Sequence, residues 1–569
     1  MKIRSEKPGE SGFFAIHKFL EEKTLPSDIE ISRGAKMKPI GEIARSLSLD
    51  PESDIDPYGR YKAKLTEAAL ARIAQNEKTG KLVLVTAMSP TKYGEGKTTM
   101  SIGLGQALAR LGHKTAVALR EPSLGPVFGT KGGAAGGGYS QAVPMEDINL
   151  HFTGDLHAIT SANNLLCAIL DNHIYQGNPL GIDPAKITFS RCMDMNDRSL
   201  KDIMVGLGGK KNIPRKDGFR ITAASEIMAV FCLAESPAEL KAMLGNISVG
   251  YNFDGDPVYA RDFSVEGSMC ALLKDAFRPN LVQSLEGVPV FIHGGPFANI
   301  AHGCNSVRAT KAALKLSDYT VTEAGFGSDL GAEKFFDIKC RKAGLSPDAA
   351  VLVATVRAIK HHGGGDMEAG FDNVLAHTEN LHRFGMNPVL AVNRFPDDTN
   401  DELALVASLC ERHDIPFAFS TAFADGGEGS LELAKKVVEQ CASKSGLRFA
   451  YAPGDTIKEK IEKIAKNIYG AARVAYSEKA EGALGDIKNP EHGCLPVCMA
   501  KTQYSLSDDP ALLNRPYGFE LNVKDIIIQT GAGFAVALTG DVMIMPGLPK
   551  TPNAEAIDLD EGGNIVNLS

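Results

Sequence analysis

A repeating alternation of an apolar run, a glycine-rich loop and an alanine-rich helical pattern constrains the fold of this chain most strongly. Several of the runs are almost continuously apolar, as is typical of strands covered on both faces. Strand–helix alternation predicts βαβ units and a parallel sheet, with ligands near the carboxyl ends of its strands. The clearest runs are Leu82–Thr86, Thr115–Leu119, Val288–His293, Ala350–Thr355, Pro388–Asn393 and Pro416–Ser420.

Charge and cysteine content argue against several classes of protein. The formal net charge of −8 gives no general attraction to nucleic acid or to an anionic membrane. The nearest pair of cysteines, Cys494 and Cys498, has no second pair with which to complete a zinc site. No stretch reaches the roughly 20 apolar residues of a membrane helix, and the first residues form no apolar signal segment. We therefore expect a cytoplasmic protein with reduced thiols and with neither nucleic acid nor membrane as a partner.

The run Leu82–Thr86 leads into a glycine loop that ends where a helical pattern begins. Backbone N–H groups of such a loop converge and favour an anion. Lys97 suits the β- and γ-phosphates of a nucleotide, and the Thr98 hydroxyl suits Mg²⁺. The first glycine of the pattern G-x-x-x-x-G-K-S/T is replaced here, but the strand and helix context is retained. The predicted ATP-binding residues are Thr91, Lys92, Tyr93, Gly94, Glu95, Gly96, Lys97, Thr98 and Thr99.

A second glycine cluster follows the next run. Arg120 stands directly after Thr115–Leu119, and the segment 131–139 is rich in glycine, so a substrate can approach its backbone closely. A guanidinium group suits a carboxylate or an acyl phosphate. Arg120 is therefore a candidate anion-binding residue, with an internal ion pair as the structural alternative.

Two histidines and an aspartate lie close together further along the chain, namely His151, Asp155 and His157. Such a group offers a metal site, an acid–base group or core packing. The residues themselves leave these alternatives open.

Together with other segments, these motifs closely resemble the formate–tetrahydrofolate ligases, also called 10-formyltetrahydrofolate synthetases. The resemblance runs from about Ile29 to the C-terminus, and the residues before it look like an extension beyond the usual start of the family. It is carried by the segments 94–99, 120–126, 131–139, 144–157, 293–303, 323–335 and 545–549.

The resemblance implies that ATP, formate and tetrahydrofolate are converted to 10-formyltetrahydrofolate, ADP and phosphate. Formate is a poor electrophile and N10 of the folate is a weak nucleophile, so formate is first converted to formyl phosphate. This intermediate must be kept from water, which suits a glycine-lined pocket with cationic donors. MgATP, tetrahydrofolate as substrate and an activating monovalent cation (K⁺ or NH₄⁺) are the implied small molecules, and a homotetramer is the implied assembly.

The resemblance also implies roles for particular residues. Lys97 and Thr98 would hold MgATP, with Thr98 on Mg²⁺, and Arg120 would hold formate and formyl phosphate. Asp155, with His151 or His157, would orient the substrates or accept the N10 proton, and the sequence does not decide between them. The glycines expected around formyl phosphate are Gly132, Gly133, Gly136 and Gly137.

Three phenylalanines are candidates for stacking on folate or adenine. Phe395 lies in the segment 393–396, which resembles a pterin-contacting segment of the family. Phe423 stands where relatives carry tryptophan, a departure that weakens the expected stacking while keeping a π-face. Phe326 lies in the segment 323–335. Core packing is the alternative for such rings.

We therefore predict an α/β protein that contains a P-loop, parallel-sheet nucleotide-binding domain and smaller α/β domains. A chain of 569 residues exceeds what one core usually supports. The expected divisions are an N-terminal extension over 1–26, a nucleotide-binding and formyl-phosphate domain over 27–345, an α/β folate-site domain over 346–450 and a C-terminal α+β domain over 451–569. The large domain can be formed from segments that are not contiguous in the sequence.

Three other classes of protein are alternatives to this interpretation. A Walker-type switch ATPase would account for Lys92, which lies near the extra lysine of such loops, but it has no need of the segment 132–138. Another ATP-dependent carboxylate ligase would use the same acyl-phosphate step with a different acid or amine. A regulatory nucleotide-binding module would not need so many special loops.

Overall fold

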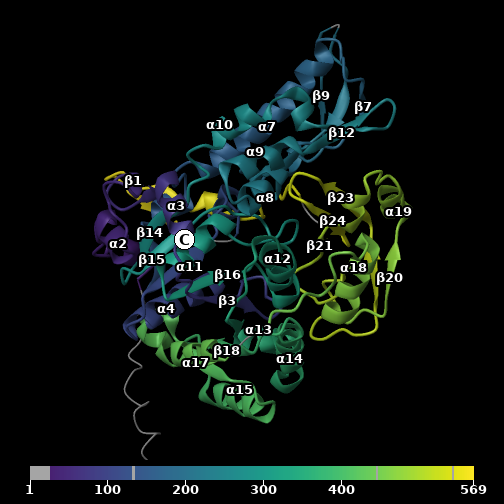
Figure 1. Ribbon diagram of the computed structural model, residues 1–569. Coiled ribbons are helices and arrows are strands. Elements are labelled where there is room, and N and C mark those ends of the chain that lie inside the picture. The colour runs from purple at the N-terminus through teal and green to yellow at the C-terminus, as the bar shows by residue number, and fades with distance from the viewer. Residues whose placement is uncertain (1–25, 131–134, 210, 444–445, 541–543, 569) are drawn as a thin grey trace, which may run out of the picture.

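A mixed sheet of twelve strands forms the centre of the computed structural model, which describes residues 26–130, 135–209, 211–443, 446–540 and 544–568 (Figure 1). Two of these strands, β5 (Gly136–Gly137) and β6 (Ser140–Val143), branch off beside β14. The others follow the order β1 (Ile55–Pro57), β2 (Ala63–Leu65), β14 (Asn280–Ser284), β15 (Pro289–Ile292), β4 (Thr115–Leu119), β16 (Tyr319–Glu323), β3 (Lys81–Ala87), β17 (Ala349–Ala354), β18 (Pro388–Asn393) and β19 (Phe417–Ser420).

The part of the sheet from β15 to β19 is entirely parallel. All six apolar runs from the sequence fall in this part, as β3, β4, β15, β17, β18 and β19. The predicted α/β fold with a parallel sheet is therefore confirmed. Strand β16 was not among the predicted runs, because threonines alternate with Tyr319 and Val321 along it. It lies between β4 and β3 and pairs with both.

Alternate side chains of β3 enter cores on opposite faces of the sheet. Val83 and Val85 pack with apolar residues of α4 (Lys97–Arg110), whereas Leu82 and Leu84 belong to the core on the other face. This follows from the two-residue repeat of a strand. Helix α17 (Leu431–Ala442) packs beside α4, while α11 (Val307–Leu316) and α14 (Met367–Arg383) cover other strands of the sheet, and α13 (Val356–His362) packs against α14.

Two further parts extend from the sheet (Figure 1). An arm rises from it, built on the long helix α7 (Asp155–Tyr175) and completed by α8 (Glu226–Leu233), α9 (Pro237–Gly245), α10 (Glu266–Leu273), β7 (Ile182–Ile187), β12 (Ser248–Asn252) and β13 (Pro257–Tyr259). A C-terminal part contains α18 (Ile457–Ile464), β20 (Arg473–Tyr476), α19 (Glu478–Gly485), β21 (Val497–Ala500), β22 (Glu520–Val523), β23 (Asp525–Gln529) and β24 (Phe534–Leu538).

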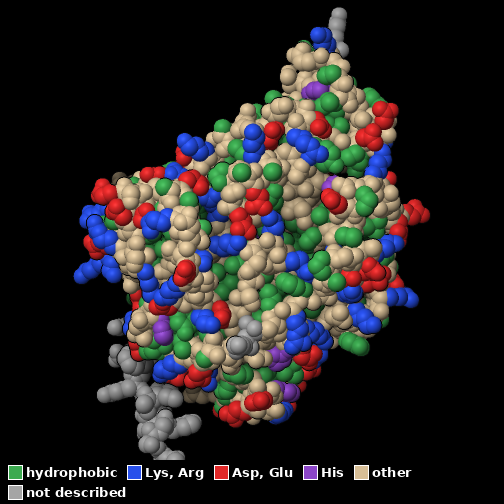
Figure 2. Space-filling model, in the orientation of Figure 1, with side chains coloured by type: hydrophobic (Ala, Val, Ile, Leu, Met, Phe, Trp, Pro, Cys, Tyr) green, Lys and Arg blue, Asp and Glu red, His purple; other side chains and the backbone are tan. Residues whose placement is uncertain are grey.

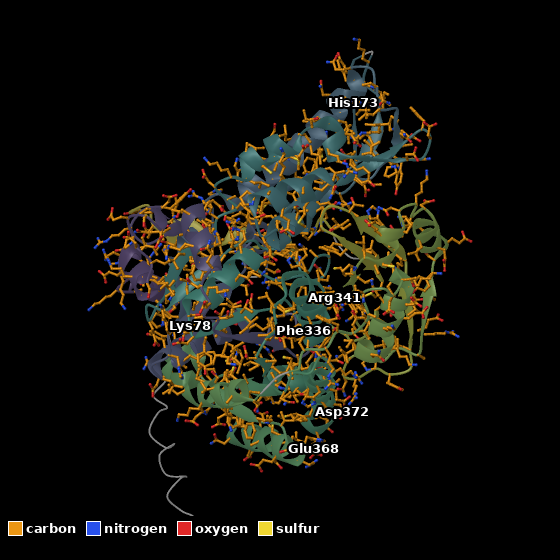
Figure 3. The ribbon with its side chains drawn as sticks, in the orientation of Figure 1. Lys78, His173, Phe336, Arg341, Glu368 and Asp372 are labelled. Carbon is orange, nitrogen blue, oxygen red and sulfur yellow. The ribbon has the colours of Figure 1, made fainter. Side chains whose placement is uncertain are left out.

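Arg341 joins the C-terminal part to the rest of the molecule (Figure 3). It begins α12 (Arg341–Ala343), and its Nη2 donates to the carbonyl of Tyr451 at 2.8 Å and to the Asp337 carboxylate at 2.9 Å. The same carboxylate accepts a hydrogen bond from the backbone N–H of Ala450 at 3.1 Å. A charged pair therefore fixes the point at which the chain leaves the main sheet.

The boundary expected near residue 345 does not separate two sheets. Strand β17, just beyond it, pairs with β3 over five residues, and β18 and β19 continue the same sheet. The strand order crosses the expected boundary because β17 lies directly beside β3, which precedes the glycine loop of residues 91–99, hereafter the phosphate loop. The sheets of residues 451–540 are separate from the large one. Of the predicted N-terminal extension, residues 1–25 lie outside the described part of the chain.

The visible surface carries basic and acidic side chains interspersed with one another (Figure 2). Among the helices that the structure describes, none is both long enough and apolar enough to span a bilayer.

Candidate functional site

The phosphate loop adopts a backbone conformation that favours glycine at two positions. Gly94 and Gly96 have φ angles of 75° and 77°, in the left-handed region. Gly96 is the N-cap of α4, and a Cβ there would lie 2.6 Å from Nδ2 of Asn393. Lys97, Thr98 and Thr99 form the first turn of the helix. The loop thus presents a helix N-terminus at the carboxyl edge of the sheet, where backbone N–H groups favour an anion.

Glu95 holds this loop from within. Its carboxylate is buried, accepts a hydrogen bond from the backbone N–H of Thr91 at 2.7 Å, and also accepts one from the hydroxyl of Thr355. The backbone carbonyl of Glu95 accepts a hydrogen bond from Asn393 at 3.2 Å. Thr91, which replaces the expected glycine, is therefore part of a bonded turn. Lys92 and Tyr93 are exposed on the outer side of the loop.

Glu323 connects the phosphate loop to Arg120. One of its carboxylate oxygens accepts a hydrogen bond from the Thr98 hydroxyl at 3.0 Å, and the other accepts one from Nη2 of Arg120 at 3.2 Å. Glu323 is only 2% exposed. It ends β16, and that strand lies between the strands that lead to the loop and to Arg120. Three neighbouring parallel strands therefore deliver a hydroxyl, a carboxylate and a guanidinium to one place.

Arg120 is held by close backbone on several sides. Its Nη1 lies 3.5 Å from the carbonyl oxygen of Pro296, and a Cβ at Gly325 would lie 3.0 Å from the same nitrogen. Its Nε is buried and has no hydrogen-bond partner among the described residues. The side chain is 21% exposed. The guanidinium is thus partly committed to Glu323 and partly available to an anion.

Asp155 lies in a buried charge cluster at the start of α7. Lys64 Nζ donates to its two oxygens at 2.8 and 3.1 Å, and Asn280 donates at 2.8 Å. Both Lys64 and Asp155 are at most 1% exposed. Burial, and then the negative charge of Asp155, raise the pKa of the nearby Glu121 carboxyl well above its usual range. Glu121 follows Arg120 in the chain, so this cluster lies directly behind the candidate anion-binding residue.

The two predicted histidines are placed differently from Asp155. His151 and His157 are both exposed. Within the described ranges, neither donates a hydrogen bond to the Asp155 carboxylate, which is surrounded by Lys64, Asn280 and Thr153. The packing favours an orienting role for Asp155. Roles for His151 and His157 stay predictions.

Phe423 packs against the described end of the glycine segment. It lies in α16 (Ala422–Asp425) after β19 and is 40% exposed. Its carbonyl accepts a hydrogen bond from the backbone N–H of Tyr139 at 2.8 Å. A Cβ at Gly137 would lie 3.0 Å from the ring, and one at Gly138 would lie 2.0 Å from the carbonyl oxygen. Side chains at these positions would push the ring away. Gly136, with a φ of 87°, precedes this contact, whereas Gly132 and Gly133 lie outside the described residues.

The other two candidate rings lie at different places on the same sheet edge. Phe395 is half-buried in the loop after β18, where its backbone N–H donates to Asp398 at 2.8 Å. Phe326 follows β16 and has a φ of 61°, which is uncommon for a residue with a side chain. It lies directly after Gly325 and three residues after Glu323, which ends β16, so it belongs to the turn beside Arg120.

A glycine loop that opens a helix after a parallel strand, with a carboxylate and an arginine converging on its threonine, defines an ATP-dependent enzyme of the P-loop class. The comparison with protein families makes this specific. The chain belongs to the formate–tetrahydrofolate ligase family, whose model matches residues 26–569. A formate–tetrahydrofolate ligase of Symbiobacterium thermophilum is 54% identical over 555 residues, covering 95% of this chain and all 100% of that relative.

The resemblance inferred from the motifs is thereby confirmed. The chain is a ligase that joins formate to tetrahydrofolate in an ATP-dependent reaction. Sequence reasoning did not single out Glu323, Lys64 or Glu121. A carboxylate at the end of a strand beside the phosphate loop was the available signal for Glu323, but it required β16 to be recognised as a strand.

Proposed function

We propose that the reaction passes through formyl phosphate at the place where Glu323 meets Thr98 and Arg120. The observation that carries this proposal is the single carboxylate that contacts both residues, at 3.0 and 3.2 Å. One residue belongs to the phosphate loop and the other is the candidate formate-binding residue. A γ-phosphate held by the phosphate loop would therefore lie beside a formate ion held by Arg120.

The residues at this place fit a magnesium ion. A hydroxyl and a carboxylate are the protein ligands that P-loop enzymes use for Mg²⁺, which otherwise keeps water and phosphate oxygens. Thr98 and Glu323 would hold the ion, and it would neutralise phosphate charge. Among the described residues, no cluster of three or more His, Cys, Asp or Glu is suited to a metal. A site made by two side chains and the nucleotide agrees with that finding.

In the first step, a formate oxygen attacks the γ-phosphorus and ADP leaves, so that a phosphorus–oxygen bond forms as another breaks. Lys97 and the N–H groups at the start of α4 stabilise the phosphates. Arg120 binds formate and reduces the repulsion between two anions. Glu121 and Asp155, which lie behind Arg120, are proposed to set its position.

In the second step, N10 of tetrahydrofolate attacks the formyl carbon and phosphate leaves with the former formate oxygen. Phe395 and Phe423 are proposed to stack on the folate, and Phe326 on folate or adenine. Gly136 and Gly137 are proposed to line the pocket of the intermediate, together with Gly132 and Gly133. Exclusion of water by this pocket protects formyl phosphate from hydrolysis.

Three further features are proposed from family membership. The protein acts in the cytoplasm, assembles as a homotetramer and is activated by K⁺ or NH₄⁺.

The test is to incubate the protein with MgATP, formate and tetrahydrofolate, to acidify the mixture and to measure methenyltetrahydrofolate by its absorbance. Formate-dependent absorbance and release of ADP are expected. Replacement of formate by acetate should abolish most turnover, because a pocket built for formate rejects the added methyl group. Equal turnover with acetate would instead favour a general carboxylate ligase.

A further inference from the structure

Arg357 lies between the phosphate loop and the loop that carries Phe395. It is the second residue of α13, which begins directly after β17. Strand β17 is flanked by β3, which leads to the phosphate loop, and by β18, which leads to Phe395. A side chain at the start of α13 can therefore reach both loops.

The contacts show that Arg357 does reach both. Its Nη2 donates to the carbonyl of Gly94 at 3.0 Å. The guanidinium carbon lies 5.1 Å from the centre of the Tyr93 ring and 5.1 Å from the centre of the Phe395 ring. Both distances are within the range of cation–π attraction. The Arg357 guanidinium thus contacts Tyr93 and the Gly94 carbonyl in the predicted ATP site. It also contacts the Phe395 ring in the predicted folate site.

The charge of this side chain has no carboxylate partner in the part of the chain that the structure describes, and its Nε is buried without a hydrogen-bond partner. The ammonium nitrogen of Lys92 lies 4.9 Å from the centre of the same Tyr93 ring. Lys92 and Arg357 therefore both lie within cation–π distance of the exposed Tyr93, in a loop whose backbone suits a polyanion.

We propose that Arg357 is a positioning residue that couples nucleotide binding to folate binding. Bound ATP fixes the peptide at Gly94, Gly94 fixes the guanidinium, and the guanidinium supports one face of the Phe395 ring. The pterin then stacks on a ring that is already in place, so less conformational freedom is lost on binding. This inference rests on the proposed place of Phe395 in the folate site.

The test compares Arg357→Gln and Arg357→Lys with the parent enzyme. For Arg357→Gln we expect the KM for tetrahydrofolate to rise about tenfold, with kcat within about threefold. A non-hydrolysable ATP analogue should tighten folate binding in the parent enzyme and no longer do so in this variant. Arg357→Lys retains the charge but not the planar fork, so it should restore part of the folate affinity and little of the coupling.

Lys360→Gln is the matched control, because it removes a positive charge from the same helix where it pairs with Glu402 on the exposed side. Lys360→Gln should leave the KM values for ATP and for tetrahydrofolate unchanged. An unchanged folate KM and unchanged coupling in a folded Arg357→Gln protein would overturn the inference. A loss confined to ATP affinity would also overturn it, since Arg357 would then serve the nucleotide alone.

Phe395→Ala separates this inference from the proposed folate site. If Phe395→Ala raises the folate KM and Arg357→Gln does not, the folate site stands and the coupling fails. If neither substitution changes the folate KM, the proposed place of Phe395 fails as well. The double variant should be less than additive, because each substitution removes the same supported ring.

Discussion

The hydroxyl of Thr98 lies 3.0 Å from a carboxylate oxygen of Glu323, although 225 positions separate the two residues in the chain. The contact exists because β16 lies beside β3, so the end of one strand meets the helix that follows the other. The second oxygen of the same carboxylate contacts Arg120. Glu323 is therefore the proposed point at which nucleotide and formate chemistry meet.

Glu323→Gln should lower kcat by at least about 100-fold while the protein remains folded, because a neutral amide would hold the proposed Mg²⁺ poorly and would lose the ion pair with Arg120. Steady-state kinetics at saturating substrates measure this effect. Glu428→Gln is the control, since Glu428 is exposed and its ion-pair partner among the described residues is Arg110. A Glu323→Gln enzyme within about threefold of the parent would remove Glu323 from the mechanism.

Lys97→Ala should lose nucleotide affinity or turnover by several orders of magnitude, because Lys97, the first residue of α4, is proposed to supply the cation of the phosphate loop. Binding of a fluorescent ATP analogue and steady-state turnover measure the two quantities. The melting temperature should stay close to that of the parent. Unchanged kinetics would contradict the assignment of this loop to ATP.

Arg120→Ala should keep ATP binding but lose the formation of formyl phosphate. The guanidinium is proposed to hold formate, whereas the loop at residues 94–99 holds the nucleotide. Formate-dependent release of ADP in the absence of folate measures this step. If formate-dependent activity stays within about threefold of the parent, Arg120 has a structural role through its pair with Glu323.

Lys64→Met should lower the free energy of unfolding by about 3–5 kcal/mol, because it leaves the Asp155 carboxylate buried without its cation. Denaturant titration measures it. The exposed pair of Lys458 and Glu481 provides a control, since Lys458→Met should cost less than about 1 kcal/mol. Equal losses of unfolding free energy in the two variants would show that the buried pair stabilises the fold no more than the exposed pair does.

Glu226 should give stability a distinctive pH dependence. Burial raises the pKa of its carboxyl to about 7, although the N–H groups of Gly531 and Ala532 donate to it. The folded state therefore holds this proton more tightly than the unfolded state. The resulting stabilisation is complete below the ordinary pKa of a glutamate and is lost as the pH rises to about 7.

Glu226→Gln should remove this part of the pH dependence, because an amide keeps the accepting oxygen and does not titrate. Melting temperatures of the variant and the parent, measured from pH 5 to about 8, isolate the effect. The buried histidines have lowered pKa values, which act in the opposite direction, but they are common to both proteins. A constant difference between the two proteins across this range would contradict the raised pKa of Glu226.

The strands whose side chains are buried on both faces of the sheet could be predicted from the sequence. Nearly continuous apolar runs such as β4 and β18 stand out, because both faces of these strands are covered. Strand β16 alternates threonine with larger residues and was missed, so Glu323 at its end was missed as well. The phosphate loop was recognised because its glycines, lysine and threonine are adjacent in the chain.

Relationships that depend on strand order were not accessible in the same way. Arg357 contacts both Tyr93 and Phe395 only because β17 lies between β3 and β18. The pair of Lys64 and Asp155 joins the antiparallel strand β2 to the start of α7. No local pattern indicates either contact. The expected boundary near 345 fell within one sheet for the same reason.

The central claim is that formate is phosphorylated before it is joined to folate. The most direct measurement uses formate labelled with oxygen-18 and follows the label into inorganic phosphate by mass spectrometry during a complete turnover. One labelled oxygen per phosphate is predicted, because the formate oxygen that attacks the γ-phosphorus leaves with it. Phosphate without the label, formed alongside 10-formyltetrahydrofolate, would contradict the formyl-phosphate route and the roles given to Arg120 and Glu323.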